Sequence, residues 1–436
     1  MKTIMITAPS SNTGKTTLTL GLLRNLKDRG LDITGFKTGP DYIDPLYHEV
    51  ACGNRSGNLD IHMMGEDGIK QAISISRNEY AVVEGAMGYF DGTYNTYESS
   101  SFHISEILDI PSILVYTPKG EMFSAIPKIK GMQDFSNGRI KGIILNKTSK
   151  RVYEMLKKQI ENYTDLEVLG YVEKDDLFEI PSRYLGLLQP HENKDLAELI
   201  ETISKKIEET VNVDKLIGLM KEIEVDRFIY PENKDITVAI AMDKAFNFYY
   251  TEDLKLFENT CNVIYFSPIE DDYLPKCDLL YISGGYPELY KKELAENKSM
   301  LESIKNYAEN DGFIYAEGGG MMYLTESIDD VKMCGVLKAK SEMTDKTQKF
   351  GYTYTELKED LFLGKKGDIL RSKEFHKSII KSDSENIFNI SKPMSDKTWE
   401  SGYRYKNVVC SYSHLNFLGN LNAFDSLLKS VKGEIK

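Results

Sequence analysis

The sequence contains no uninterrupted apolar run long enough to cross a bilayer, although 41% of its residues are apolar. A membrane-spanning helix needs about 20 consecutive apolar residues, so we expect no membrane span. The chain opens on a short apolar stretch, Lys2 to Thr7, that leads directly into a glycine-containing loop and leaves no room for a secretion signal. The sequence therefore predicts a soluble, cytoplasmic protein.

Cysteine is scarce, and the chain has no long basic block. The five cysteines are odd in number and scattered, and none forms a C-x-x-C pair. This pattern indicates reduced thiols and offers neither a disulfide framework nor a zinc site. The net charge of -13 would repel a nucleic-acid backbone, so nucleic acid is excluded as a main partner. A few local cationic groups could still bind an anionic small molecule.

A phosphate-binding pattern follows the first apolar stretch. The segment "APSSNTGKTT" (8–17) ends in Gly-Lys-Thr-Thr, the end of a Walker A sequence, although Pro9 stands where the first glycine of the full pattern belongs. In such loops backbone N–H groups surround phosphate oxygens, the lysine reaches the β and γ phosphates, and the threonine can bind Mg²⁺. The alternative is a helix N-terminus that happens to carry Lys and Thr. We expect ATP to contact Asn12, Thr13, Gly14, Lys15, Thr16 and Thr17.

Acidic side chains follow two further apolar stretches in this half. Asp41 and Asp44 lie in "GFKTGPDYIDP" (35–45), and Glu84 comes directly after Ala81-Val82-Val83. Loops at the carboxyl ends of strands bind ligands in α/β sheets, and carboxylates there suit Mg²⁺. We expect a magnesium site at Thr16, Asp41 and Glu84, with Asp41 and Asp44 as catalytic candidates. The alternative for both aspartates is turn formation.

The length of 436 residues favours two domains. Alternating strand and helix patterns predict a doubly wound parallel sheet over residues 1–193. Residues 194–233 have many Lys and Glu and apolar residues at helical spacing, which predicts a helical linker. After Asn233 the strand pattern restarts and predicts a second open α/β sheet over 234–436.

The second half contains the parts of an acyl-transfer site. "FIYAEGGGMMYL" (313–324) is typical of a strand, a tight turn and a helix, with Gly318 at the apex where a nucleophile would stand. Gly284 and Gly285 could present backbone N–H groups to an oxyanion, and His414 could act as a base. The alternative for His414 is a structural histidine. Asn416 could only hydrogen-bond and cannot replace a charged orienting carboxylate.

These strings together resemble one family, the cobyrinic acid a,c-diamide synthases, which include the nickel-sirohydrochlorin and hydrogenobyrinic acid a,c-diamide synthases. The resemblance spans nearly the whole chain in family order. It rests on "APSSNTGKTTLTLGLL", "FKTGPDYIDP", "NLDIHMM", "EGAMGYFDG", "IPSRYLGLL" (which includes Arg183), "AMDKAFNFYY", "FSPIEDDYLP", "SGGYPELY", "EFHKS" and "SYSHLNF".

The resemblance implies a synthetase domain similar to dethiobiotin synthetase, followed by a class I type glutamine amidotransferase domain. Members of the family use ATP and Mg²⁺ to activate the a and c acetate carboxylates of cobyrinic acid or a related tetrapyrrole, and ammonia attacks the acyl phosphate. The resemblance implies that Lys15, Thr16 and Glu84 stabilise the transferring phosphoryl group. A homodimer and the choice of macrocycle are left open.

The family elbow reads A-E-C-G-G, whereas this chain reads Ala-Glu-Gly-Gly-Gly at 316–320. We therefore expect that the chain does not hydrolyse glutamine through a cysteinyl thioester, and that it uses free ammonia or ammonia supplied otherwise. Gly318 could be natural or engineered. Other readings are a noncatalytic tetrapyrrole- and ATP-binding paralogue, or a partitioning-type ATPase that would leave the second half unexplained. Smaller departures from the family pattern are found at Asn12, Tyr184, Ser372, Lys373 and Asn416.

Overall fold

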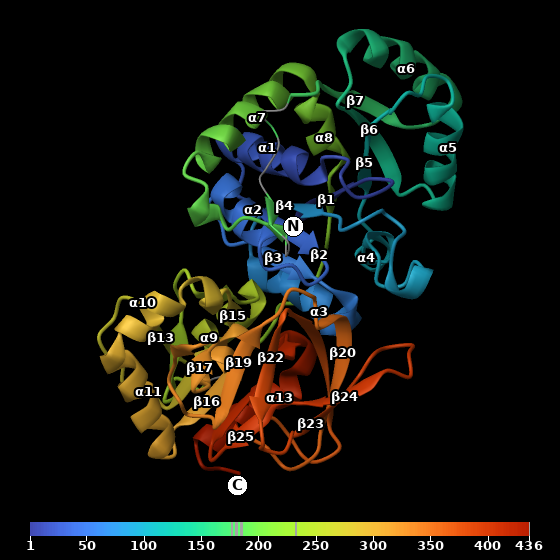
Figure 1. Ribbon diagram of the computed structural model, residues 1–436. Coiled ribbons are helices and arrows are strands. Elements are labelled where there is room, and N and C mark those ends of the chain that lie inside the picture. The colour runs from blue at the N-terminus through green and yellow to red at the C-terminus, as the bar shows by residue number, and fades with distance from the viewer. Residues whose placement is uncertain (176–177, 179–181, 184–185, 232, 436) are drawn as a thin grey trace. The chain divides into compact units, whose positions relative to one another are not determined.

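The computed structural model describes residues 1–435 except 176–177, 179–181, 184–185 and 232. The chain forms two compact units, drawn in Figure 1. Unit 1 comprises Met1–Ile61 and Glu66–Phe228, and unit 2 comprises His62–Gly65 and Ile229–Lys436. Most of the family string "IPSRYLGLL", including Tyr184, lies outside the residues whose side chains are described.

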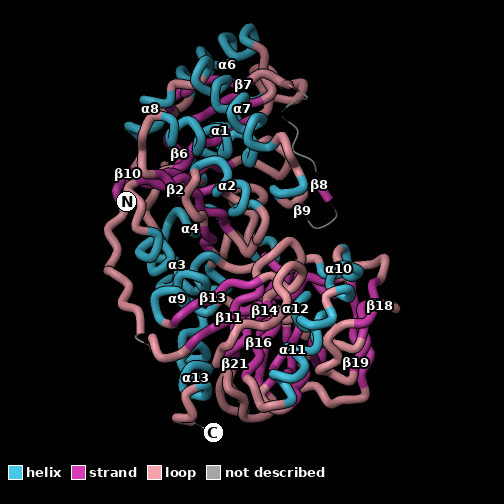
Figure 2. Tube along the Cα trace, turned by 90° about the vertical axis from the view of Figure 1, so that its left-hand side faces the viewer, coloured by secondary structure: helices cyan, strands magenta, loops and turns pink. Residues whose placement is uncertain are grey.

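Unit 1 is built on a parallel sheet, as the sequence predicts. The strand order is β3-β2-β4-β1-β5-β6-β7, and the short β10 pairs antiparallel with β1. Helices cover both faces of this sheet: those of one face lie toward the viewer in Figure 2, and those of the other lie at the right in Figure 1. Most residues of the parallel strands are therefore buried, and most of these are apolar. The strands are β1 (Lys2–Thr7), β2 (Ile33–Thr38), β3 (Gly57–Leu59), β4 (Tyr80–Glu84), β5 (Ser112–Tyr116), β6 (Ile140–Asn146), β7 (Glu167–Val172) and β10 (Lys221–Glu222).

The helices of unit 1 form two layers. Three of them, α1, α2 and α7, pack together on one face, and α5 and α6 pack together on the other, as right-handed crossovers in opposite directions require. The helices are α1 (Lys15–Asp28), α2 (Asp44–Cys52), α3 (Ile61–Ser76), α4 (Ser101–Ile107), α5 (Ala125–Phe135), α6 (Lys150–Tyr163), α7 (Leu196–Thr210) and α8 (Val213–Leu219). Of these, α3 is interrupted at Gly65, which has φ 72°, and its residues His62–Gly65 belong to unit 2.

The segment expected as a linker is helical, but α7 and α8 are built into unit 1 rather than joining two domains. The apolar stripe of α7 packs on α1. Gly21 of α1 leaves the room for this contact, because a Cβ there would lie 2.5 Å from atoms of Ile203 and Ile207. Both isoleucines are at most 1% exposed. The apolar spacing alone could not show that this stripe has a partner.

Unit 2 contains a second sheet that is parallel except at one edge, in the order β13-β11-β14-β16-β26-β25. This confirms the predicted open α/β architecture. Its strands are β11 (Thr237–Ala241), β13 (Asn262–Phe266), β14 (Leu279–Ile282), β16 (Phe313–Glu317), β25 (Tyr403–Tyr405) and β26 (Val408–Ser411). Its helices are α9 (Thr251–Thr260), α10 (Lys291–Glu296), α11 (Lys298–Glu309), α12 (Gly319–Leu324) and α13 (Leu421–Val431).

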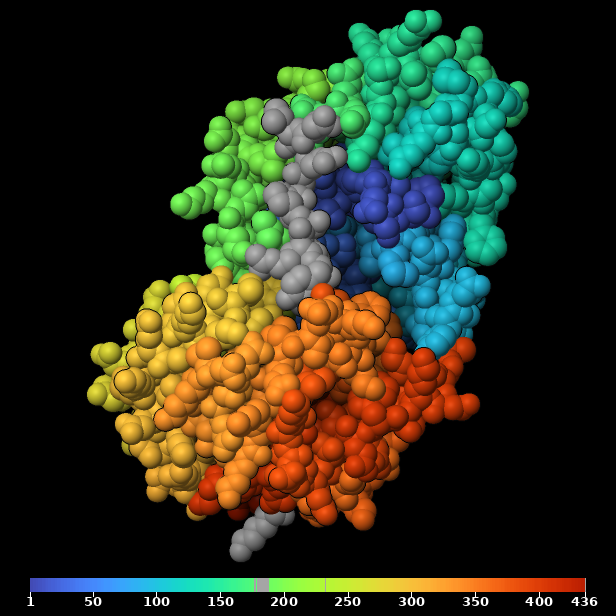
Figure 3. Space-filling view, viewed as in Figure 1, coloured from blue at the N-terminus to red at the C-terminus, as the bar shows by residue number. Residues whose placement is uncertain are grey.

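Smaller sheets that the sequence did not predict complete unit 2. One runs β24-β23-β20-β21-β27, another β18-β17-β19-β22, and β12 pairs with β15. In the space-filling view, the orange residues of the antiparallel strands occupy much of the visible face of unit 2 (Figure 3). The strands are β12 (Phe246–Phe248), β15 (Gly284–Gly285), β17 (Ser327–Ile328), β18 (Val331–Lys332), β19 (Ala339–Met343), β20 (Lys349–Leu357), β21 (Ile369–His376), β22 (Ser378–Ser382), β23 (Phe388–Ser391), β24 (Thr398–Ser401) and β27 (His414–Leu415).

In the described part of the chain, no helix combines the length and the apolar character needed to span a membrane.

Candidate functional sites

The loop between β1 and α1 folds tightly over the start of the helix. Gly14 caps α1 with φ 87°, a left-handed conformation that favours glycine. A Cβ at this position would also lie 2.2 Å from Nδ2 of Asn146, which donates a hydrogen bond to the Thr13 carbonyl at 2.7 Å. Asn12 has φ 60°, which asparagine tolerates better than most residues. Asn146 at the end of β6 therefore contacts the phosphate loop and stabilises its conformation.

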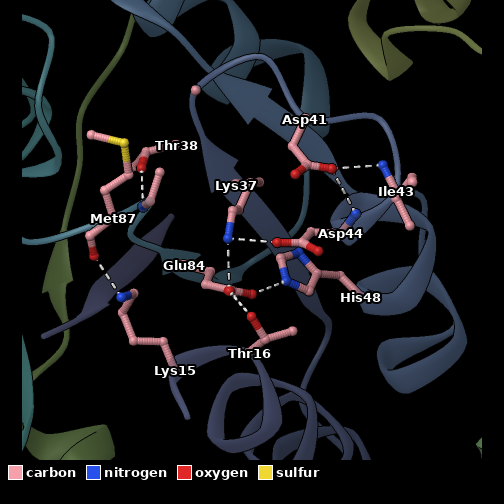
Figure 4. Close-up of polar contacts among 12 residues, drawn as sticks. Lys15, Thr16, Lys37, Thr38, Asp41, Ile43, Asp44, His48, Glu84 and Met87 are labelled. Atoms are coloured by element: carbon pink, nitrogen blue, oxygen red, sulfur yellow. Dashed lines mark hydrogen bonds and ion pairs between the residues drawn. The ribbon is translucent and has the colours of Figure 1, made fainter. Parts of the chain in front are cut away.

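Lys15 spans this loop. Its Nζ donates to the carbonyls of Ser10 at 3.0 Å and Met87 at 2.5 Å (Figure 4), and the residue is 7% exposed. Burial, together with the positive charge of Lys37, lowers the pKa of Lys15 to about 8. Phosphate oxygens could replace the two carbonyl acceptors, and that Lys15 contacts the nucleotide stays a prediction.

Glu84 ends β4 as a fully buried carboxylate with three side-chain partners. Its Oε1 accepts from Thr16 Oγ1 at 2.5 Å and from Lys37 Nζ at 2.8 Å, and its Oε2 pairs with His48 Nε2 at 2.7 Å (Figure 4). Burial alone would raise the pKa of Glu84, but Lys37 and His48 outweigh it and hold that pKa well below its usual range. Glu84 is therefore ionised at neutral pH.

Lys37 at the end of β2 links this carboxylate to α2. Its Nζ lies 2.6 Å from Oδ2 of Asp44. Burial alone would lower the pKa of Lys37. The negative charges of Asp44 and Glu84 outweigh burial and raise that pKa above its ordinary value, so the ammonium stays charged. Burial and the neighbouring Asp41 raise the pKa of Asp44 above its ordinary value. Asp41 has a structural task of its own, because its Oδ1 accepts from the backbone N–H groups of Ile43 and Asp44 at 2.7 and 3.0 Å.

His48 was not predicted from the sequence as a site residue. This residue is fully buried, and in the described chain its Nδ1 has no hydrogen-bond partner. A proton on Nδ1 would be an unsatisfied donor, so the proton sits on Nε2 and is donated to Glu84. A signal was present, because His48 follows Asp44 by four residues on α2 and so lies on the same face of the helix.

The donor set at the phosphate loop fits a magnesium ion that arrives with a nucleotide. Thr16 Oγ1 and Glu84 Oε1 are oxygen donors 2.5 Å apart, and Mg²⁺ takes one or two protein ligands beside phosphates and waters. The described residues contain no group of three or more His, Cys, Asp or Glu side chains arranged to hold a metal by themselves. A site completed by phosphate oxygens is consistent with this. That Asp41 joins the metal site stays a prediction.

The turn after β16 is a strained elbow, as the sequence predicts. Gly318 has φ 51° and ψ -113°, and its N–H donates to the Ser411 carbonyl at 2.8 Å. A Cβ at Gly318 would lie 2.6 Å from Nε2 of His414. The imidazole of His414 therefore lies in the space next to Gly318 that the Cβ of a nucleophilic side chain would need.

The predicted oxyanion glycines lie beside this elbow. A Cβ at Gly284 would lie 2.7 Å from Cε1 of His414, and one at Gly319 would lie 3.3 Å from the backbone nitrogen of Gly285. Unit 2 therefore brings together Gly284 and Gly285 of β15, His414 of β27 and Gly318 at the elbow. Any residue other than glycine at position 284 or 318 would require the imidazole of His414 to move.

The carboxylate that contacts His414 comes from an unexpected position. Glu317, directly before the elbow, is 1% exposed, and its Oε2 lies 3.2 Å from Nδ1 of His414. Asn416 instead caps the next turn, where its Oδ1 accepts from the N–H of Gly419. Glu317 was not among the predicted site residues, although a charged residue at the end of an apolar strand is a signal that the sequence contains.

None of the cysteines replaces the missing nucleophile. Burial raises the pKa of each thiol, to about 12 for Cys261 and Cys410 and to about 11 for Cys277. Cys410 pairs in register with Ala316 on the neighbouring strand, below the elbow. A thiolate is therefore strongly disfavoured at these three positions.

Comparisons with known proteins agree with this geometry. Residues 4–187 match the CobQ/CobB/MinD/ParA nucleotide binding domain, and residues 237–421 match the CobB/CobQ-like glutamine amidotransferase domain. This pair of domains defines the chain as a two-domain amidoligase with a nucleotide-binding half and an amidotransferase half.

The chain belongs to the cobyrinate a,c-diamide synthase family. It is 40% identical to the cobyrinate a,c-diamide synthase of Clostridium tetani, over 98% of this chain and 100% of the relative. It is 41% identical to that of Clostridium acetobutylicum, again over 98% and 100%. Among solved structures, the MinD cell division protein of Aquifex aeolicus has a TM-score of 0.31 and 15% identity, and covers 52% of this chain and 100% of its own.

Proposed function

We propose that this chain uses ATP to amidate the a and c acetate carboxylates of cobyrinic acid or a related tetrapyrrole. The observation that carries this proposal is full-length similarity to proteins named cobyrinate a,c-diamide synthase, in a chain whose Lys15, Thr16 and Glu84 form one cluster at the phosphate loop. A cytoplasmic location and a homodimer remain predictions.

The reaction needs ATP because a carboxylate is a poor electrophile. Its negative charge repels nucleophiles, and its leaving group would be oxide. In the proposed sequence a carboxylate oxygen attacks the γ phosphorus and ADP leaves. Ammonia then attacks the carbonyl carbon of the acyl phosphate, inorganic phosphate leaves, and the nitrogen loses one proton. Charge stabilisation and positioning dominate the catalysis of such transfers.

Residues at the phosphate loop would perform these tasks. Lys15 would bind the β and γ phosphates after releasing its two carbonyl partners. Thr16 and Glu84 would hold Mg²⁺, which supplies charge neutralisation on the transferring phosphoryl group. Asn12, Thr13, Gly14 and Thr17 complete the loop. Lys37 would stay protonated beside Glu84 and keep that carboxylate in place.

The two aspartates would act on the substrate side of this cluster. Asp44 is buried with its Oδ2 on Lys37, which places a carboxylate of raised pKa beside the phosphate loop. We propose that Asp44 orients the incoming ammonia, since a group that holds a proton more readily than an ordinary carboxylate can accept one from the attacking nitrogen. Asp41 would fix the loop that carries Asp44, through its two backbone hydrogen bonds.

The nitrogen source follows from the elbow of unit 2. Without a thiol at Gly318, glutamine cannot be converted to a thioester there. Ammonia needs no such activation, because its lone pair attacks an acyl phosphate directly. The chain alone would therefore use ammonium and not glutamine.

The test incubates the full chain with ATP, Mg²⁺ and a tetrapyrrole acid, and compares ¹⁵N-ammonium with amide-labelled ¹⁵N-glutamine by mass spectrometry. Cobyrinic acid and nickel-sirohydrochlorin serve as parallel substrates. We expect labelled diamide from ammonium only, and labelled product from glutamine only when a separate glutaminase is added. No product from either nitrogen source, or brisk product from glutamine with this chain alone, would overturn the proposal.

A further inference from the structure

Unit 2 contains a buried histidine and carboxylate pair that the proposed use of ammonia does not need. Glu317 accepts hydrogen bonds on both oxygens. Its Oε1 accepts from Tyr315 Oη at 2.6 Å and from the backbone N–H of Leu415 at 2.9 Å. Its Oε2 pairs with Nδ1 of His414 at 3.2 Å. Tyr281 Oη and Ser283 Oγ also lie within 3.3 Å of Oε2.

The partners of Glu317 decide where His414 holds its proton. The N–H of Leu415 can only donate, so Oε1 must accept. With Oε2 as the acceptor facing His414, the imidazole proton belongs on Nδ1. Nε2 then carries the lone pair, and Nε2 lies 2.6 Å from the place where a Cβ of residue 318 would stand. The unprotonated nitrogen of His414, Nε2, therefore faces the elbow at residue 318.

We propose that Glu317 is the positioning residue for His414, and that it keeps unit 2 a complete glutaminase centre except for the thiol, so that Gly318→Cys alone restores glutamine hydrolysis. This inference goes beyond the ATP-dependent reaction, because hydrolysis of glutamine is measured without ATP or tetrapyrrole. Either proposal can therefore fail without the other.

The restored chemistry balances with the groups present. The thiol proton of the new cysteine passes to His414 Nε2 while sulfur bonds to the side-chain amide carbon of glutamine. The carbon–nitrogen bond breaks, and the leaving ammonia takes that proton. Water then attacks the thioester, its proton returns through Nε2 to sulfur, and glutamate leaves. Throughout, Glu317 accepts from Nδ1 of His414, which keeps Nε2 directed at the reacting atoms.

The elbow has kept the backbone geometry that such a cysteine requires. Gly318 holds φ 51° and ψ -113°, although glycine at this position would be free to relax. The contact that a new Cβ must relieve involves the far edge of the His414 ring, its Nε2 and Cε1, and no backbone atom within 3.4 Å. A cysteine would therefore need the imidazole, and no backbone segment, to move, and would adopt a left-handed φ that is strained for a residue with a Cβ.

The first test is the tautomer of His414, read by NMR in chain labelled with ¹⁵N-histidine. His414→Gln assigns the signal. We expect the proton on Nδ1 in the native chain and on Nε2 in Glu317→Gln. The reason is that the new amide must keep its oxygen toward Leu415 N–H and turn its NH₂ toward Nδ1. The same tautomer in both proteins would overturn the positioning role.

The second test measures release of glutamate from glutamine. We expect no hydrolysis by the native chain or by Gly318→Ala, which adds the Cβ without the thiol. Gly318→Cys should be at least about 100-fold above Gly318→Ala. In the double variant Gly318→Cys/Glu317→Gln, kcat should be about 10⁴-fold lower than in Gly318→Cys, with little change in KM. A wrong histidine tautomer has an effect of this size in a Ser-His-Asp triad.

Two outcomes of this second test would overturn the inference. One is a Gly318→Cys chain that melts like Gly318→Ala and releases no glutamate. The other is a Gly318→Cys chain whose activity is unchanged by Glu317→Gln. If Gly318→Cys does not fold, the proposal that one substitution suffices is wrong, and the NMR measurement still decides the role of Glu317.

Discussion

At the scale of single residues, the charge of Lys15 should set the pH dependence of nucleotide binding. Its pKa is lowered from 10.5 to about 8, so the ammonium is lost from the free protein as pH rises above 8. ATP favours the charged form, and its affinity should be flat below pH 8 and fall up to about tenfold per pH unit above it. Titration calorimetry with ATP from pH 6.5 to 9.5 measures this slope.

Lys15→Arg is the matched control for this pH dependence. A guanidinium stays charged across the whole range, so the variant should bind ATP with an affinity that no longer changes between pH 7 and 9.5. An equal slope in both proteins would show that another group controls the pH dependence.

Glu84 should contribute strongly to the stability of unit 1. Glu84→Gln removes the charge that compensates Lys37 and breaks the pairing with His48. Breaking one partner of a buried ion pair costs about 3–5 kcal/mol. Chemical denaturation should show a loss of this order, whereas Glu302→Gln, at an exposed position of α11, should change stability by less than about 0.5 kcal/mol. An equal loss of stability in Glu84→Gln and Glu302→Gln would contradict the description of Glu84 as a buried carboxylate paired with Lys37 and His48.

At the scale of elements, the packing of α7 on α1 depends on Gly21. Gly21→Ala places a Cβ 2.5 Å from Ile203 and Ile207 and 3.3 Å from the backbone of Ile203. Overpacking of this kind costs about 1–3 kcal/mol. The melting temperature of the transition that includes unit 1 should fall by several degrees in calorimetry.

Gly131 in α5 provides the control for this substitution. It is exposed, and nothing lies within 4 Å of its added Cβ. Gly131→Ala should stabilise unit 1 by about 0.5–1 kcal/mol, because alanine loses less conformational freedom in a helix than glycine does. If Gly21→Ala were equally stabilising, α7 would not pack on α1 as described.

At the scale of the whole molecule, ATP should stabilise the folded chain in spite of the net charge of -13. A ligand at 100 times its Kd adds about 2.7 kcal/mol to the free energy of unfolding. Differential scanning calorimetry with ATP and Mg²⁺ should show the shift, and Lys15→Ala should remove most of it. An unchanged melting profile of the native chain at saturating ATP would contradict nucleotide binding.

Much of this fold could be predicted from local sequence. Buried parallel strands are continuous apolar runs, and Gly14, Lys15 and Thr16 follow the first of them at the spacing of a phosphate loop, so the sheet of unit 1 and its nucleotide end were predictable. The elbow was equally visible in "FIYAEGGGMMYL". The antiparallel sheets of unit 2 were not predicted. In β20 the buried positions Thr353 and Thr355 carry polar side chains, so the alternation of burial along the strand is not an alternation of apolar and polar residues.

The sequence by itself determined the class of fold, the phosphate loop and the absence of a nucleophile at Gly318, because each is a property of consecutive residues. Only the tertiary structure decided which side chains share a proton or a charge. Lys37 and His48 meet at Glu84 from different elements, and Glu317 takes the place beside His414 that Asn416 cannot fill. Contacts of this kind depend on which strands lie side by side, and no spacing along the chain encodes that directly.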